Sequence, residues 1–192
     1  MSRFCIKEGY TERTSVPSWD DTSNQDECQK LIYEMAKEVL EEYNFNSVLD
    51  IGCGSGFKLV KYFNNCKTLG IDVPRTVEYL KQRYSDKFWT DVFEPVQGYD
   101  FVICSDVVEH FEDSNVLMEM LQKCNAKLLV ISTPDRDSRN ISEHNGPPSW
   151  EYHYREWNTQ EFGQYVSLFF DVINHVNIPN ESSQCILAKM KS

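Results

Sequence analysis

Stretches of apolar residues with the spacing of strands alternate along the chain with stretches that have the spacing of helices. Between residues 26 and 43, apolar side chains such as Leu31, Met35 and Val39 recur every third or fourth position, with acids and lysines between them. This spacing predicts an amphipathic helix. Further helices are predicted at 58–63, 77–84, 116–124 and 159–168. Strands are predicted from Ser47 into Asp50 and at 68–72, 88–91, 99–104 and 127–132.

The order strand, helix, strand is typical of an α/β fold with a doubly wound, mostly parallel sheet, because right-handed crossovers place helices on both of its faces. Two later apolar runs, at 169–173 and 184–188, predict a closing antiparallel pair. No internal repeat interrupts the pattern. We therefore expect one domain over residues 26–192, preceded by a polar segment, residues 1–25, that closes over the site as a flap.

Composition narrows the class of protein further. With 192 residues, 41% hydrophobic and 26% charged, the chain suits one soluble domain without a membrane span. The first residues lack the apolar run of a signal peptide, so we expect a cytoplasmic protein, monomeric or homodimeric. Seven scattered cysteines indicate neither a disulfide framework nor a zinc site. A formal charge of −11 makes nucleic acid an unlikely partner.

The segment after the first strand carries the strongest signal for a ligand. Asp50 is followed by Gly52, Gly54 and Gly56, and alternating glycines let the backbone approach a ligand closely. A dinucleotide fingerprint would need a glycine where Phe57 stands, and the Asp50 carboxylate would repel a pyrophosphate. A cationic cofactor such as S-adenosylmethionine fits better, because its ammonium group can be bound by Asp50 directly or through water. The alternative is a plain glycine-rich turn.

Acidic residues also end the following strands, and strand ends share one crevice in such sheets. Asp72 ends the second strand and is suited to accept hydrogen bonds from both ribose hydroxyls. Asp91 is a candidate acceptor for the adenine amino group. For either residue the alternative is a helix N-cap.

These motifs together resemble the class I S-adenosylmethionine-dependent methyltransferases over residues 26–190. The matching stretches are 48–56, 70–72, 90–91 and 100–110. The resemblance implies a Rossmann-like, seven-stranded sheet whose last strand is antiparallel, with the cofactor lying across residues 52–56. The cofactor-binding residues it implies are Asp50, Gly52, Cys53, Gly54, Gly56, Asp72, Val73, Asp91, Val92, Ser105 and Asp106. A weaker resemblance, in stretches 20–27, 144–148 and 153–157, is to small methyltransferases of glycan or secondary-metabolite pathways.

Transfer to a hydroxyl would need a base, and four residues are candidates. His110, His144 and His153 can accept a proton near neutral pH, and Glu109 precedes the first of them. The structural alternatives are that Glu109 and His110 cap a helix and that His153 packs beside Trp157.

Candidate acceptor contacts lie in two segments. In the flap, Tyr10 and Trp19 would close over the acceptor, with Asp20 beside them. In the long loop after 127–132 and just beyond it, Arg136, Arg139 and Arg155 are candidates to hold a carboxylate or phosphate. A solvated loop with internal ion pairs is equally compatible with the sequence.

The predicted function is methyl transfer to a small-molecule acceptor, by O-methylation of a hydroxyl on a sugar or related metabolite, without a metal. A rival is a divalent-metal-dependent RNA 2′-O-methyltransferase, because Asp106, Glu109, His110 and His153 are similar to the metal ligands of small-RNA 3′-end enzymes. Asp106 departs from that pattern, since those enzymes have a glutamate there. A second rival is a non-catalytic cofactor-binding partner subunit.

Overall fold

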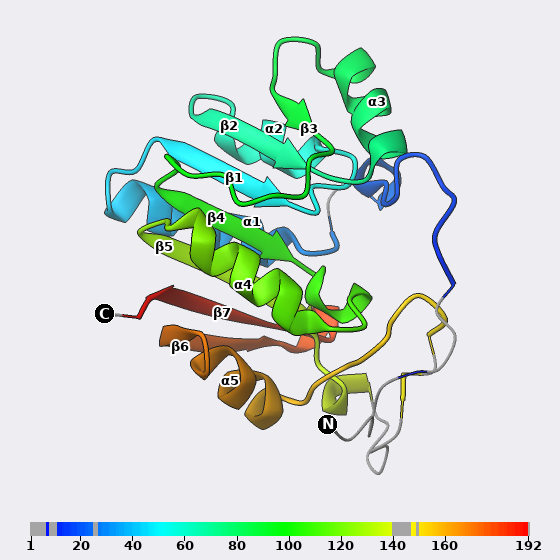
Figure 1. Cartoon of the computed structure of the whole chain (residues 1–192), viewed down its shortest axis with the longest axis vertical. Helices are drawn as coiled ribbons and strands as arrows, with labels where there is room; N and C mark the ends of the chain where they lie inside the picture. The colour runs from blue at the N-terminus through cyan, green and yellow to red at the C-terminus, as the bar shows by residue number, and fades with distance from the viewer. Residues whose placement is uncertain (1–6, 8–10, 25–26, 140–146, 149, 192) are drawn as a thin grey trace.

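The computed structural model describes residues 7, 11–24, 27–139, 147–148 and 150–191. Seven strands form one sheet in the order β3-β2-β1-β4-β5-β7-β6 (Figure 1). Their bounds are β1 Ser47–Ile51, β2 Lys67–Ile71, β3 Trp89–Thr90, β4 Phe101–Ser105, β5 Leu128–Pro134, β6 Phe170–Ile178 and β7 Ser183–Met190. Strands β1 to β5 are parallel, and β7 runs antiparallel to both of its neighbours. The predicted fold class is confirmed.

Helices cover both faces of the sheet. They are α1 Lys30–Glu42, α2 Phe57–Phe63, α3 Pro74–Arg83, α4 Ser114–Cys124 and α5 Thr159–Ser167. The described residues also form four short 3₁₀ turns: η1 Asp21–Asn24, η2 Val108–His110, η3 Asp137–Arg139 and η4 Pro179–Glu181. None of the helices in the described ranges is both long and apolar enough to cross a membrane.

Two hydrophobic cores lie on the two faces, and β1 shows why. Its side chains alternate between the faces, so that Val48 packs with α1, α2 and α3, whereas Leu49 and Ile51 pack with α4 and α5. Every residue of β1 and β4 is buried. Such strands are predicted easily from sequence, because a strand covered on both faces is mostly apolar.

Several elements differ from their predicted bounds; α3, for example, was expected from residue 77 and begins at Pro74. The helix expected from residue 26 begins at Lys30 in the described part, and the helix expected from 116 begins at Ser114, where the Asp113 side chain accepts from Asn115 N. Strand β6 extends to Ile178, well beyond the apolar run. As the edge strand it pairs only with β7, so much of it is solvent-exposed and its sequence stays polar.

Candidate active site

The carboxyl ends of β1, β2 and β4 open into a cavity of about 800 Å³. Its wall includes the glycine loop after β1, the acids at the strand ends and residues from the N-terminal segment. In sheets of this kind the ligand lies at the point where strand order reverses, here between β1 and β4.

Hydrogen bonds fix the glycine loop to the end of β2. Gly52 N and Cys53 N both donate to the Ile71 carbonyl, at 2.8 and 3.1 Å. Gly52 has φ +77°, and an added Cβ would lie 2.2 Å from a Val107 methyl, so only glycine fits here. Gly56, predicted to bind cofactor, is not on the cavity wall: its Cβ would meet the Trp89 ring at 2.7 Å. Close packing against Trp89 of β3 therefore explains why position 56 is a glycine.

Asp50 is fully buried beneath the site. One carboxylate oxygen accepts from the Tyr33 hydroxyl at 2.9 Å, and the other has no hydrogen-bond partner in the described structure. Burial raises the pKa of this carboxyl to about 7, although the Tyr33 hydrogen bond opposes the shift. The unused oxygen fits a donor that a ligand supplies, such as an ammonium group or a water bound to it.

Asp72 lies on the cavity wall at the end of β2. Its carboxylate accepts from Gly54 N at 2.7 Å, from Val73 N at 2.8 Å and from the Ser18 hydroxyl at 3.0 Å. Burial raises the pKa of Asp72, while these hydrogen bonds lower it. The residue predicted to accept ribose hydroxyls therefore already accepts one hydroxyl from the protein itself.

Aromatic side chains define the next part of the wall. Asp91 lines the cavity together with Phe93 and Phe111, whose ring centroids are 5.4 Å apart. Val92, predicted beside Asp91 as a cofactor contact, is 52% exposed and is not on the wall.

The N-terminal segment, residues 11–24, lies over the part of the cavity next to the glycine loop. The carbonyl oxygen of Trp19 is 3.2 Å from the point where a Gly54 Cβ would lie, and Trp19 lines the cavity. Farther on, the Asp21 carboxylate forms an ion pair of 2.7 Å with Lys58, and both side chains are buried. Arg75 donates to the carbonyls of Ser15 and Arg13. These contacts hold the segment across the cavity mouth.

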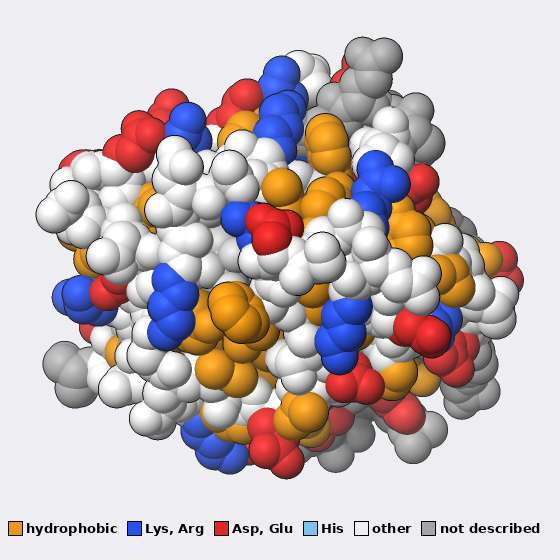
Figure 2. Space-filling model, turned by 90° about the horizontal axis from the view of Figure 1, so that it is seen from above, with side chains coloured by type: hydrophobic (Ala, Val, Ile, Leu, Met, Phe, Trp, Pro, Cys, Tyr) orange, Lys and Arg blue, Asp and Glu red, His pale blue; other side chains and the backbone are white. Residues whose placement is uncertain are grey.

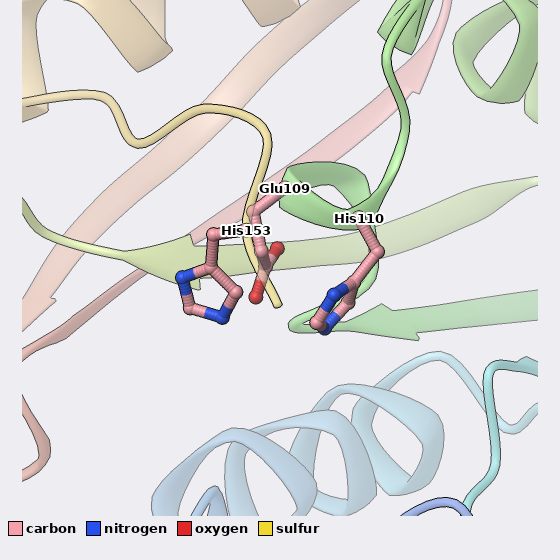
Figure 3. Close-up of side chains that lie close together, drawn as sticks. All are labelled: Glu109, His110 and His153. Carbon is pink, nitrogen blue, oxygen red and sulfur yellow. The ribbon is translucent and has the colours of Figure 1, made fainter. Parts of the chain in front are cut away.

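Glu109, His110 and His153 meet at the other end of the cavity. One ligand atom from each lies within 4.8 Å of the other two, and Figure 3 shows the Glu109 carboxylate between the two imidazoles. The His110 Nδ1 is 2.6 Å from the Tyr152 carbonyl, and the His153 Nδ1 is 2.7 Å from the Glu156 carboxylate. These acceptors favour the tautomer with hydrogen on Nδ1, which leaves each Nε2 able to bind a cation or a proton.

Burial changes the protonation of this cluster. It lowers the pKa of His110 to about 4, with a further contribution from His153, so this imidazole is neutral at pH 7. It raises the pKa of Glu109 well above its usual range, and the neighbouring Asp106 charge adds to that effect. One oxygen of Glu109 accepts from Thr133 at 3.1 Å, while the other has no hydrogen-bond partner in the part of the chain that is described. A divalent cation would satisfy that oxygen.

Asp106 and Ser105, the other residues predicted at the end of β4, have partners outside this cluster. Asp106 accepts from the Ser132 hydroxyl at 2.7 Å and from the Gln29 amide at 3.1 Å, and the Ser105 hydroxyl lies 3.0 Å from that of Ser132. Both residues line the cavity, but Asp106 is not in the group that could hold a metal. The predicted set of four ligands is thus reduced to three.

The predicted acceptor-binding arginines lie elsewhere. Arg136 is buried and forms a double interaction with the Glu161 carboxylate, at 2.9 and 3.1 Å. Arg155 stacks over Trp157 at 5.3 Å, and neither arginine is on the cavity wall. Tyr10, His144 and the side chain of Arg139 lie outside the described residues. Sequence reasoning missed several other wall residues, among them Arg13, which lies in a segment without a motif or a periodic pattern.

A family model described as a methyltransferase domain matches residues 22–189, so the chain belongs to that family. The fold and the site define a class I S-adenosylmethionine-dependent methyltransferase, and S-adenosylmethionine is its cofactor.

Three relatives are informative. Over 115 residues the chain is 25% identical to (S)-tetrahydroprotoberberine N-methyltransferase of Eschscholzia californica, a match of 53% of this chain and 33% of that protein. The chain thus spans about a third of the length of this curated relative. The structure of the small RNA methyltransferase HEN1 has a TM-score of 0.68 at 20% identity, covering 97% of this chain and 27% of that one. The N-methyltransferase NodS of Bradyrhizobium japonicum WM9, with S-adenosyl-L-homocysteine, has a TM-score of 0.64 at 15% identity, covering 94% and 95%. The two structural likenesses show the fold alone.

Proposed function

We propose that this protein transfers the methyl group of S-adenosylmethionine to a hydroxyl of its acceptor, and that a divalent cation bound by Glu109, His110 and His153 holds that hydroxyl. The observation that carries the proposal is the meeting of these three ligand groups within 4.8 Å on the wall of the cofactor cavity. Two imidazoles and a carboxylate are ligands that Mn²⁺ and related ions accept.

The residues of the same wall are suited to the cofactor. Asp72 would accept the ribose hydroxyls, and the Asp91 carboxylate would lie near the adenine between Phe93 and Phe111. Gly52, on that wall, and Asp50, which is buried beneath it and is not on the wall, would bind the methionine end. We propose that residues 1–25 act as a flap that opens for this cofactor, since Ser18 and Trp19 now lie over its site.

In the reaction, the acceptor oxygen forms a bond to the methyl carbon, the carbon–sulfur bond breaks, and the hydroxyl proton is released to solvent. A bound cation would lower the pKa of that hydroxyl and fix its position. The protein's own contribution is orientation: Tyr152 and Glu156 hold the two imidazoles through their Nδ1 atoms, and the walls exclude water.

A small hydroxylated acceptor agrees best with the charge of the molecule. The net charge is −11, and on the face in Figure 2 the lysines and arginines lie scattered among acidic and uncharged side chains. A long polyanion would need a continuous basic surface.

A second candidate acceptor is the 3′-terminal ribose of an RNA. The Glu109, His110 and His153 cluster favours it, because two adjacent hydroxyls of such a ribose can bind one cation together. The likeness in fold to HEN1 supports the same candidate.

The test measures transfer of labelled methyl by the purified chain to a panel of sugars and polyols, and to short RNAs ending in ribose or 2′-deoxyribose. We expect transfer with Mn²⁺ or Mg²⁺, its loss in excess EDTA, and its return when the cation is restored. Methylation of the ribose end alone would assign the RNA acceptor, since it also blocks periodate cleavage of the terminal diol. Methyl transfer that persists in EDTA would overturn the proposed role of the cation and would indicate that a neutral histidine acts as the base. Absence of transfer with every acceptor, despite cofactor binding, would favour a non-catalytic subunit.

A further inference from the structure

Arg13 stands out among the charged residues of the cavity wall. The acids of that wall are Glu12, Asp21, Glu27, Asp72, Asp91, Asp106, Glu109 and Glu181, against two arginines, Arg13 and Arg75. Arg75 forms an ion pair with Glu12 at 3.1 Å. Arg13 has no carboxylate partner within the part of the chain that is described, so its charge is available to a ligand.

Three aromatic rings surround the Arg13 guanidinium. It lies 4.9 Å from the Tyr152 ring, 5.2 Å from Trp19 and 5.9 Å from Trp150. One nitrogen, Nη1, donates to the Ser18 carbonyl at 3.4 Å, whereas Nε is buried and has no hydrogen-bond partner among the described residues. Cation–π contacts fix the plane of the group but leave its N–H edge unsatisfied. A buried N–H of a charged group that lacks an acceptor is costly, which indicates that an acceptor is supplied by a ligand.

This arginine adjoins the methyl-transfer end of the cavity. Trp150, over which it lies, stacks on His153 with ring centroids 5.3 Å apart. The Arg13 charge also acts on His110. On its other side a second cavity of about 500 Å³ is lined by residues 13–20 with Trp150 and Tyr152. Arg13 therefore lies between the cation-ligating cluster and a space that can take the rest of an acceptor.

We propose that Arg13 binds an oxyanion of the acceptor, a phosphate or a carboxylate, next to the hydroxyl that is methylated. This inference rests on the proposed function for the placement of the hydroxyl, but the anion site itself does not depend on turnover. The guanidinium presents parallel N–H groups, which match two oxygens of one phosphate or carboxylate. The surrounding rings exclude water and offer faces on which a planar part of the acceptor stacks.

The first experiment needs no acceptor. Inorganic phosphate and, separately, acetate are titrated into the protein saturated with S-adenosylhomocysteine, and the Arg Nε–H signals are followed by ¹⁵N NMR. We expect one Nε–H signal to shift downfield on saturation and to vanish in Arg13→Gln, with anion affinity at least tenfold weaker. Arg13→Lys keeps the charge but lacks the parallel N–H groups of the guanidinium, so it should bind either anion more weakly than the wild type. Arg83→Gln removes an arginine that also lies over tyrosine rings, away from the cavity, and should leave binding unchanged.

The second experiment compares two acceptors that differ only in the anion, glycerol and glycerol 3-phosphate. Arg13→Gln should raise KM at least tenfold for the phosphate and leave KM for glycerol unchanged. If neither is methylated, the proposed function fails for these acceptors while the NMR result still decides the anion site. Anion binding that is equal in the wild type and Arg13→Gln would overturn the inference. So would loss of thermal stability in Arg13→Gln with no anion binding to the wild type, because Arg13 would then only link the N-terminal segment to Trp150.

Discussion

Carboxyl groups of one chemical type behave differently in this site because their hydrogen-bond partners differ. Asp72 accepts hydrogen bonds on both oxygens, whereas Asp50 and Glu109 each have one oxygen without a hydrogen-bond partner in the described ranges. Burial raises the pKa of all three. The two with an unused oxygen are the ones for which a cationic group, the cofactor ammonium or a metal ion, would restore the charged form.

If Asp50 binds the ammonium group as proposed, the affinity for S-adenosylhomocysteine should depend on pH. Its pKa is about 7 in the free protein, and the ligand's ammonium group favours the ionised form. Binding should therefore strengthen as pH rises from 6 to 8, by about tenfold if only the carboxylate binds. Calorimetry across this range measures the slope, which should be flat in Asp50→Asn.

Adenosine provides the control for this prediction, because it lacks the ammonium group and its affinity should not follow Asp50. The stability of the cofactor-free protein should depend on pH in the opposite direction. A raised pKa means that the folded state holds the proton more tightly, so stability falls as pH rises from about 4 to about 7. A steep pH slope in Asp50→Asn would assign the titration to another group.

Glu156 is expected to tune the cation site without touching the cation. Its carboxylate accepts from His153 Nδ1 at 2.7 Å and is buried, so it orients the ring and keeps the hydrogen on Nδ1. Glu156→Gln should weaken Mn²⁺ binding roughly ten- to hundredfold and leave the affinity for S-adenosylhomocysteine unchanged. Calorimetry with Mn²⁺ measures both variants. Glu151→Gln, on the exposed neighbouring turn, should bind Mn²⁺ like the wild type, and equal affinity in Glu156→Gln would remove this role.

At the scale of elements, the buried parts of the fold were the predictable ones. Strands β1, β4 and β5 are covered on both faces, so their burial can be predicted from the apolar composition of each short segment. Asp72 could be expected at the site because a strand end after a glycine loop has a fixed place in the sheet. Strand β6 could be predicted only in part, because its polar second half depends on pairing with β7.

The site residues that sequence missed come from elements without periodicity. Arg13 reaches the cavity because Arg75 and Ser18 fix a segment that has no helix or strand pattern of its own. Arg136 was expected at the acceptor, yet its partner Glu161 lies 25 positions later, in the first turn of α5. Such pairings over long sequence separations leave no local signal in the chain.

If Asp72 binds the cofactor ribose as proposed, the N-terminal segment should compete with the cofactor for this carboxylate. The Ser18 hydroxyl donates to the carboxylate oxygen that a ribose hydroxyl would use. Ser18→Ala should therefore strengthen binding of S-adenosylhomocysteine, by three- to tenfold, since a hydrogen bond to a charged group contributes about 1 kcal/mol or more. Calorimetry measures the change. Ser15→Ala removes a hydroxyl from the same segment that bonds only to the Ser18 carbonyl and should have no effect. Weaker binding in Ser18→Ala would mean that this hydroxyl assists the cofactor instead.

In the whole molecule, the cavity and the hydrogen bonds of Asp100 lie at opposite ends of the strands. The cavity lies at the carboxyl ends of the strands, whereas Asp100 joins the amino ends of three of them. Its carboxylate accepts from the Ser47 hydroxyl at 2.8 Å and pairs with Lys127 at 2.7 Å, which ties the starts of β1, β4 and β5 together. A substitution at the amino ends of the strands should therefore leave the cavity at their carboxyl ends unaffected.

Asp100→Asn tests this separation through acid unfolding. The Lys127 hydrogen bond, aided by Ser47, lowers the pKa of Asp100, so its contribution is present above the unfolded-state pKa of about 4 and is lost as pH falls through the folded-state value. The variant should be about 1 kcal/mol less stable in urea at pH 7 and equal to the wild type at pH 2. Asp86→Asn, which removes an exposed carboxylate 3.8 Å from Lys87, should change neither value. The wild type and both variants should bind S-adenosylhomocysteine with the same affinity. Weaker binding in Asp100→Asn would mean that the two ends of the strands are energetically coupled.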